Sequence, residues 1–470
     1  MFREYKNPFD REDIFKDKVK ILVKLDTFEI IRDEEKDIIE RLILLERLGC
    51  FRVLFILSEK EELNQIVKNN DGEVVNYYDE ERYRPMIVMK TNKSDISEGL
   101  IYGTYDYFKG TKQSNGKSNI SVLESFLIDK LRVDYVVTHN KDIYFNNEKK
   151  VKNIDLNTLI DEIRILLVNR GIYNQYTNST VNQGLYYQHR ITSVFTYYSI
   201  LRYYTGELDN KKYGEVKEQT YSLAQRLIFL CKASDKISYY SLKKQGNDNR
   251  DECLYNFAYF IMLATGIFDD FAWILNRLYF LELKDMDIKL RCVYKNNEFL
   301  TSKFMKKLAN KNEELSGILK NSDIQNDINI LYPIRDTLQH RAFITAMGSM
   351  KVVGNRTIDG ESTITIPKEC IEFIKNSNIG TAEQWGATFE IGDMYCINPQ
   401  LFTEKILYLI NKISKCIVEG IAWSEFLNNE ELNKIEIEID KLKSGELKTW
   451  TFANDTLYFG RINLIEGNNV

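Results

Sequence analysis

The sequence predicts an α+β multidomain protein that is mainly helical, with an N-terminal α/β domain on a parallel sheet and an all-α domain after it. Up to about residue 145, short apolar runs alternate with segments of helical period, which is typical of βα units. From about residue 155, apolar residues recur every three or four positions over long stretches, which indicates helices. Because no proline lies between Pro85 and Pro333, those helices can run long.

The N-terminal domain is predicted to cover residues 1–152. Each short apolar run is followed by a segment with helical spacing, the pattern of a strand followed by a helix. Because these units repeat along the chain, we expect the strands to pair in parallel. The predicted strands are KILVKL, FRVLFIL, PMIVMK and DYVVT, and the predicted helices are EEKDIIERLILLERLG, EKEELNQIVKN and SVLESFLIDKL.

The helical domain is predicted over residues 153–430, and a C-terminal tail over residues 431–470. We expect a helix from Pro333 to Met347 and then an inserted hairpin, because KVVGNRTIDGESTITIP holds two β-prone runs around an Asp359-Gly360 turn signal. The tail holds one charged helix and the strand-like run TWTFANDTLYFG. The other predicted helices are LNTLIDEIRILLVN, QHRITSVFTYYSILRYY, EQTYSLAQRLIFLCKA, NFAYFIMLATGIFDDFAWILNRLYFLE and QLFTEKILYLINKISKCIVEGIAWSEFL.

The composition, with 44% hydrophobic and 28% charged residues, is that of a folded protein. A chain of 470 residues is longer than one hydrophobic core usually organises, which predicts more than one domain. A net charge of −5 and a pI near 5.7 give no global attraction for a polyanion, so a nucleic acid would need local basic groups. Seven dispersed cysteines without a CxxC pair predict reduced thiols. A charged N-terminus and the lack of a long apolar run predict a cytoplasmic protein without a membrane span.

The candidate catalytic residues lie in the segment ILYPIRDTLQHR, which contains Arg335, Asp336 and His340. On a helix, a separation of five residues places Arg335 and His340 about 140° apart, so they can flank a groove. Asp336 and His340 are four residues apart, so Asp336 could orient the imidazole. His340 could act as general base and acid, and Arg335 could bind a phosphate. Such a pair suits RNA, whose own 2′-hydroxyl can be the nucleophile.

This motif resembles that of the HEPN superfamily, whose ribonucleases carry an arginine, then a polar residue, then a histidine a few residues later. The setting is also similar, because the motif follows a long amphipathic helix, here Asn256 to Glu282. The resemblance covers roughly residues 180–428. It implies a homodimer whose two motifs face one cleft and cut RNA without a metal, leaving a cyclic phosphate and a 5′-hydroxyl. By analogy it implies a toxin or anti-phage defence effector with an antitoxin or trigger partner.

The N-terminal segments ILVKLD and VLESFLIDKLRVDYVVTHNKDIY resemble a PIN-type nuclease domain, which gathers acidic residues at the carboxyl ends of parallel strands to bind a divalent metal. The resemblance implies that Asp26 and Glu124 bind Mg²⁺ or Mn²⁺. The family's Thr-x-Asp reads Thr138-His139-Asn140 here, which removes one negative charge, and Asp142 lies two positions further. We therefore favour a degenerate PIN-like domain that serves recognition or regulation.

Three alternatives stay open at the level of sequence. The helical domain could be a non-catalytic dimeric sensor or scaffold, in which Arg335 ties a helix to a carboxylate. The N-terminal domain could be an active metal-dependent nuclease that acts through Asp26 and Glu124. It could also be an unrelated α/β domain, such as a receiver-like or Rossmann-like sheet, because a strand followed by an aspartate is a common pattern.

Overall fold

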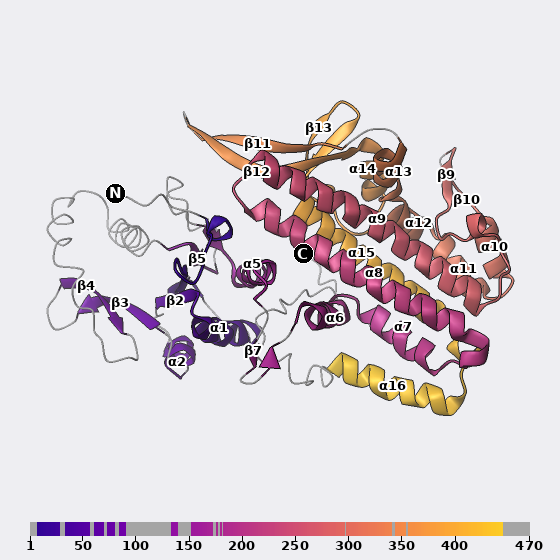
Figure 1. Ribbon diagram of the computed structural model, residues 1–470, viewed down its shortest axis with the longest axis horizontal. Helices are drawn as coiled ribbons and strands as arrows, with labels where there is room; N and C mark the ends of the chain where they lie inside the picture. The colour runs from indigo at the N-terminus through magenta and orange to yellow at the C-terminus, as the bar shows by residue number, and fades with distance from the viewer. Residues whose placement is uncertain are drawn as a thin grey trace. The chain divides into compact units, whose positions relative to one another are not determined.

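The protein divides into two compact units, and the division lies between Leu167 and Val168. The sequence predicts a domain boundary at residues 152/153, which is upstream of this division. The tail from residue 431 begins inside a helix of the second unit. The computed structural model (Figure 1) describes residues 7–28, 33–56, 61–69, 73–79, 84–90, 133–139, 152–172, 175–176, 179–180, 182–296, 298–340, 344–353 and 356–444.

The N-terminal unit contains a six-stranded sheet in the order β4-β3-β2-β1-β5-β6. All neighbouring strands pair in parallel except β3 and β4, which are antiparallel. The predicted parallel sheet is therefore confirmed, and β3 and β6 are strands that the sequence analysis missed. The strands are β1 (Val19–Lys24), β2 (Phe51–Ile56), β3 (Glu73–Asp79), β4 (Arg84–Lys90), β5 (Tyr135–Val137) and β6 (Lys152–Ile154).

The core of this unit lies around β1 and β2, whose residues are buried on both faces, as expected of strands in a parallel sheet. Helix α1 (Asp33–Leu45) packs against β2 and against α2 (Glu61–Asn69). A helix between these strands and β5, predicted over SVLESFLIDKL, lies outside the described residues. Helix α5 (Leu156–Asn169) matches its predicted range and contains the division between the two units.

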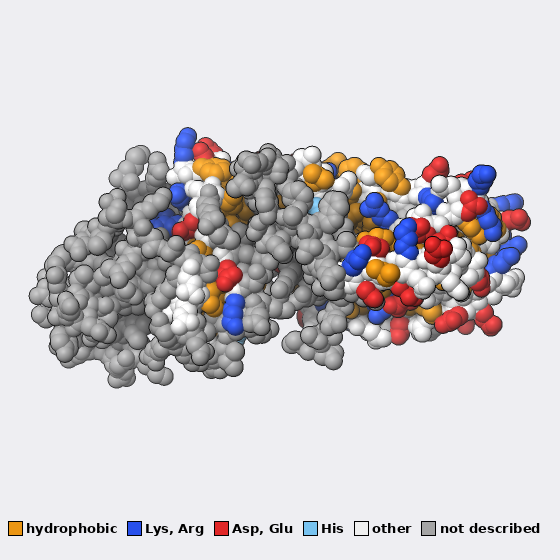
Figure 2. All heavy atoms as spheres, turned by 90° about the horizontal axis from the view of Figure 1, so that it is seen from below, with side chains coloured by type: hydrophobic (Ala, Val, Ile, Leu, Met, Phe, Trp, Pro, Cys, Tyr) orange, Lys and Arg blue, Asp and Glu red, His pale blue; other side chains and the backbone are white. Residues whose placement is uncertain are grey.

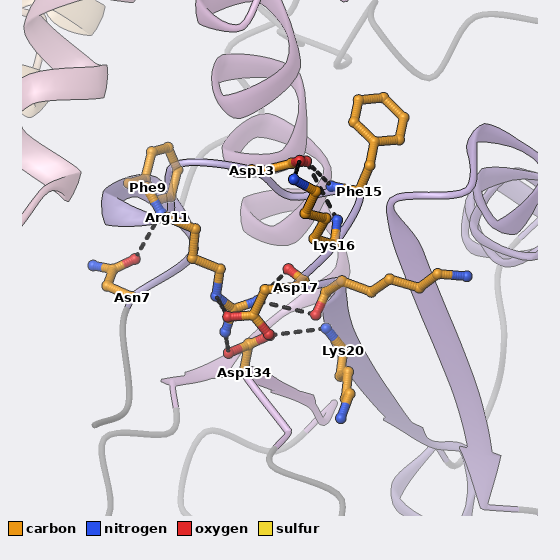
Figure 3. Close-up of polar contacts among 10 residues, drawn as sticks. Asn7, Phe9, Arg11, Asp13, Phe15, Lys16, Asp17, Lys20 and Asp134 are labelled. Atoms are coloured by element: carbon orange, nitrogen blue, oxygen red, sulfur yellow. Dashed lines mark hydrogen bonds and ion pairs between the residues drawn. The ribbon is translucent and has the colours of Figure 1, made fainter. Parts of the chain in front are cut away.

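A buried ion pair fixes the segment before β1 to the start of β5 (Figure 3). The Arg11 guanidinium donates to the Asp134 carboxylate, and the second carboxylate oxygen accepts from the backbone N–H of Lys20 at 2.8 Å. Arg11 also donates to the carbonyl of Lys18 at 3.0 Å. Because both charges are buried and their donors and acceptors are used, this pair is a structural clamp.

The second unit is mainly helical, as predicted. Its two longest helices, α8 and α9, pack along each other (Figure 1), and α15 packs against α8, α7 and α11. The predicted helix QHRITSVFTYYSILRYY forms two helices that meet at Phe195. The helices are α6 (Gln183–Val194), α7 (Thr196–Glu207), α8 (Asn210–Leu242), α9 (Asn247–Leu278), α10 (Lys303–Ala309), α11 (Glu313–Lys320), α12 (Ser322–Asn329), α13 (Tyr332–His340), α14 (Lys368–Lys375), α15 (Pro399–Gly420) and α16 (Asn429–Ser444).

The expectation of an all-α domain with one hairpin is wrong, because this unit also contains a four-stranded antiparallel sheet in the order β11-β12-β14-β13. The predicted hairpin is present as β11 and β12, but Asp359-Gly360 lies inside β12, where Asp359 pairs with Met350 beside a register shift. The predicted helix from Pro333 to Met347 is described as α13 up to His340, and Ala346 and Met347 belong to β11 instead. The strands are β7 (Gln175–Tyr176), β8 (Ser179–Thr180), β9 (Val293–Lys295), β10 (Glu298–Leu300), β11 (Ala346–Val353), β12 (Arg356–Pro367), β13 (Ala387–Ile391) and β14 (Met394–Ile397).

One helix within the described residues, α9, is long and apolar enough to cross a membrane by length and composition. About two thirds (67%) of its most apolar window is buried inside the protein, as in the core helix of a soluble protein. The seven cysteines are free thiols, and six of them are buried.

Two glycines with positive φ offer a test of the β13–β14 hairpin. Gly386 has φ +84°, and a Cβ there would lie 2.9 Å from the backbone oxygen of Asn398. Gly392 has φ +57° with open space around it. We expect Gly386→Ala to lower the free energy of unfolding by about 3 kcal/mol, because the close contact adds to the strain of a positive φ, and Gly392→Ala, where only that strain acts, by about 1 kcal/mol. Urea denaturation measures both, and equal losses would contradict the close approach of Gly386 to Asn398.

Candidate functional site

Helix α13 carries the predicted motif and is anchored by its first turn. Tyr332, Pro333 and Ile334 are buried, and proline at the second helical position has no N–H to leave unpaired. The helix packs against α9, α12, α14 and β12. Arg335 and Asp336 are partly exposed, and His340, the last described residue of the helix, is exposed. The buried face thus fixes the helix, and its other face presents the polar motif.

The Arg335 side chain is restrained without being neutralised by a close ion pair. Its guanidinium lies 5.7 Å from the centre of the Tyr332 ring, a cation–π arrangement. Within the described part of the chain, no hydrogen bond or ion pair engages the side chain of Arg335. Its N–H donors are therefore available to a ligand such as a phosphate.

Asp336 is bound to a second arginine. Its carboxylate lies 3.7 Å from the Arg291 guanidinium, which also stacks 4.3 Å from the centre of the Tyr332 ring. The Arg291 Nε donates to the Asn329 side chain at 2.9 Å. Among the described residues, no hydrogen bond or ion pair joins Asp336 to His340. In this structure Asp336 therefore holds Arg291 beside Tyr332.

The His340 imidazole is solvent-exposed, and its neighbour Gln339 donates to the sulfur of Met262 on α9 at 3.6 Å. That contact places the end of α13 beside the middle of α9. An exposed imidazole can exchange protons with a substrate and with solvent.

Two acids on α9 were missed by the sequence analysis, although an Asp-Asp pair inside the apolar run GIFDDFAW is an identifiable signal. Burial raises the pKa of Asp269, and the positive charge of Arg335 is the largest effect that lowers it. Arg335 therefore lies close enough to Asp269 to feel its charge. Burial, and next the charge of Asp269, raise the pKa of Tyr332 well above its usual range.

Asp270 is part of a packed contact between α8 and α9. Its carboxylate lies 2.8 Å from the Arg226 guanidinium and accepts from the Gln219 amide at 2.7 Å. A Cβ at Gly266 would lie 1.9 Å from a guanidinium nitrogen of Arg226, so any larger residue would require this arginine to shift. Burial raises the pKa of Asp270 to about 6, and Arg226 opposes that rise.

The carboxyl edge of the N-terminal sheet was the second predicted site. Asp26 lies in the 3-10 turn Leu25–Thr27 directly after β1, and Glu124 and Asp142 lie outside the described residues. The turn contacts the second residue after β5, because the His139 N–H donates to the Thr27 hydroxyl at 3.2 Å. The described part of the chain contains no group of three or more His, Cys, Asp or Glu side chains placed to hold a metal.

The sequence analysis also missed an acid at this edge. Glu35 in α1 is 5% exposed, and its carboxylate lies 3.9 Å from Nδ1 of His139. The His139 ring lies 5.3 Å from that of Phe28, just after the turn that carries Asp26. Glu35 and His139 are therefore further polar groups at the edge predicted for metal binding.

Comparison with known proteins identifies no relative. No protein-family model, curated protein or solved structure matches the chain. The resemblances to HEPN ribonucleases and to PIN-type nucleases therefore rest on the motif residues, and any function must be inferred from the chemistry of those residues.

The buried Asp270 predicts a pH dependence of stability. Because its pKa in the folded protein, about 6, is above the ordinary 3.8, the folded state binds more protons between these values, and stability falls as pH rises through this window. Asp270→Asn removes this loss. Relative to wild type, we expect its free energy of unfolding to rise by at most about 3 kcal/mol from about pH 4 to about pH 7.

Urea denaturation at the two pH values tests this. Asp251→Asn on the same helix is the control, because Asp251 is exposed and its replacement changes no buried group. If wild type and Asp270→Asn show the same pH dependence, Asp270 is not the titrating group.

Proposed function

We propose that this protein is a metal-independent, HEPN-like endoribonuclease that cleaves RNA at Arg335 and His340. The observation that carries the proposal is the pairing on one short helix of an exposed imidazole with an arginine whose donors are not engaged by described residues. The cation–π contact with Tyr332 already restrains the arginine, so its side chain loses less conformational entropy when it binds a phosphate.

The proposed reaction needs no external nucleophile. His340 takes the proton of the RNA 2′-hydroxyl, and the 2′-oxygen forms a bond to phosphorus. The bond between phosphorus and the 5′-oxygen breaks, and that oxygen takes a proton from a protonated imidazole. Arg335 stabilises the negative charge that develops on the phosphate oxygens. The products are a 2′,3′-cyclic phosphate and a 5′-hydroxyl.

A homodimer fits this chemistry, because one His340 can accept the first proton while the imidazole of a second copy donates the other. We further propose a cytoplasmic toxin or anti-phage defence effector that is held inactive by an antitoxin or released by a trigger. Figure 2 shows one face of the molecule, and basic and acidic side chains are interspersed over its described surface. Such a mixed surface favours local recognition of RNA over a general attraction to polyanions.

The N-terminal sheet supports a second candidate, a metal-dependent nuclease. The buried Glu35 and the exposed His139 lie at the carboxyl edge beside the turn that carries Asp26. Carboxylates at such an edge suit Mg²⁺ or Mn²⁺. In this candidate Asp26, with Glu124 and Asp142, would hold the metal and activate a water molecule.

We expect His340→Ala and Arg335→Ala each to reduce cleavage of labelled RNA in EDTA at least about 100-fold, because each removes a group that acts in the transition state. Arg335→Lys should restore part of the activity, since lysine keeps the charge but loses the bidentate geometry. Lys307→Ala on α10 is the control, because it changes an exposed residue outside the motif helix. Gel analysis with mapping of the product ends is the measurement.

The outcome separates the candidates. Activity in EDTA that survives His340→Ala would contradict the proposed mechanism. Cleavage that needs Mn²⁺ and is lost in Asp26→Asn would assign the activity to the N-terminal unit. A protein that cuts no RNA, and whose cellular effect persists in His340→Ala, would be the sensor or scaffold.

A further inference from the structure

Contacts between α8 and α9 show which parts of these long helices lie side by side. Gln219 binds Asp270, Arg226 lies over Gly266, and the Ser241 hydroxyl lies 3.5 Å from the sulfur of Cys253. In these pairs the residue numbers of α8 increase while those of α9 decrease, so the two helices are antiparallel. Residues 229–236 of α8 therefore lie alongside residues 255–262 of α9. Figure 1 shows the two helices side by side.

The outer face of α9 carries a row of large exposed side chains. Tyr255 is 71% exposed, Tyr259 is 42% exposed and Met262 is 36% exposed. Their spacing of four and three residues places them on one face of the helix, and Gly266 continues the row four residues later. The Arg226 guanidinium reaches from α8 over Gly266, so an arginine lies at this end of the row. We call this row, from Tyr255 through Tyr259 and Met262 to Gly266 with the Arg226 guanidinium of α8 over it, the α9 track.

The α9 track leads to the candidate catalytic residues. Met262 contacts Gln339, the residue before His340. Asp269, three residues after Gly266, interacts electrostatically with Arg335, whose positive charge lowers the pKa of Asp269. From Tyr255 to Gly266 the track extends over about 16 Å at the rise of an α-helix. An extended ligand on this row would therefore run toward α13.

Two lysines of α8 lie over neighbouring aromatic rings. The Lys232 ammonium lies 5.4 Å from the ring centre of Phe229, itself 42% exposed, and Lys236 lies 5.8 Å from that of Tyr239. Burial lowers the pKa of Lys236, and the nearby Glu252 opposes that shift. By the register of the two helices, Lys236 is level with Tyr255, so a cation lies near an open aromatic ring. Lys232 lies 5.3 Å from the ring centre of Tyr187 and is therefore on the side of α8 that faces α6.

We propose that the α9 track binds a single-stranded segment of the RNA substrate and leads it to His340. Bases stack on the rings of Tyr255 and Tyr259, and phosphates lie near Arg226 and Lys236. This deepens the proposed function and rests on it. Unstacked bases have free faces for the tyrosines, while paired bases do not, so single strands are preferred. Arg226 lies beside Asp270 and Lys236 is near Glu252, and the remaining N–H donors of these two cations favour a ligand with phosphates over a second copy of the chain, which would bring the same cations.

The test is fluorescence anisotropy of fluorescein-labelled oligouridine with full-length protein in EDTA, in the His340→Ala background so that no cleavage interferes. We expect Tyr255→Ala with Tyr259→Ala to weaken binding at least about tenfold, since each ring removes a stacking surface. Tyr255→Phe with Tyr259→Phe should bind within about twofold of the parent, because the rings remain. Tyr294→Ala, which removes an exposed tyrosine of β9, should leave the affinity unchanged.

An unchanged affinity for oligouridine in the alanine double variant would overturn the α9 track, as would equal binding of an RNA hairpin. Sedimentation of the same variants detects the rival role: loss of a dimer with unchanged RNA affinity would make the row a protein interface. The proposed nuclease is judged separately by cleavage with His340 intact. Tyrosine-dependent binding without cleavage would contradict the nuclease alone, and cleavage with tyrosine-independent binding would contradict the α9 track alone.

Discussion

The helical unit depends on how a charge is buried between its two longest helices. Asp270 enters an apolar contact at a high cost of desolvation, which its raised pKa reflects. Arg226 offsets part of that cost from α8, and its guanidinium occupies the space that Gly266 leaves open at the crossing. Together with the buried apolar face of α9, this contact sets which residues of α9 face solvent and which face α13.

The same contact links the core to the candidate chemistry. Once Asp270 faces Arg226, its neighbour Asp269 is directed toward Arg335, and Tyr255, Tyr259 and Met262 form the exposed row. Arg335 is then held between the charge of Asp269 and the ring of Tyr332. A half-buried cation that lacks a close partner among the described residues is costly for stability, and such residues are common at binding sites.

The sequence predicted the parts of the fold that depend on local period. The range of α5, strands such as β1 and β2, and the helical domain follow from the spacing of apolar residues. It missed β6 because three residues carry no period, and it misplaced the turn because Asp359-Gly360 occupies an irregularity inside β12. It placed Arg335, Asp336 and His340 on one helix, but Arg291 is remote in sequence and its contact with Asp336 exists only after packing.

The most direct test of the account is cleavage of an RNA in which the ribose at a mapped cut site is replaced by 2′-deoxyribose. If His340 activates the 2′-hydroxyl, wild-type protein should bind this substrate as before and should no longer cut it at that position. Continued cleavage there would show that another nucleophile, such as a metal-activated water, attacks the phosphate. That result would contradict the mechanism assigned to Arg335 and His340.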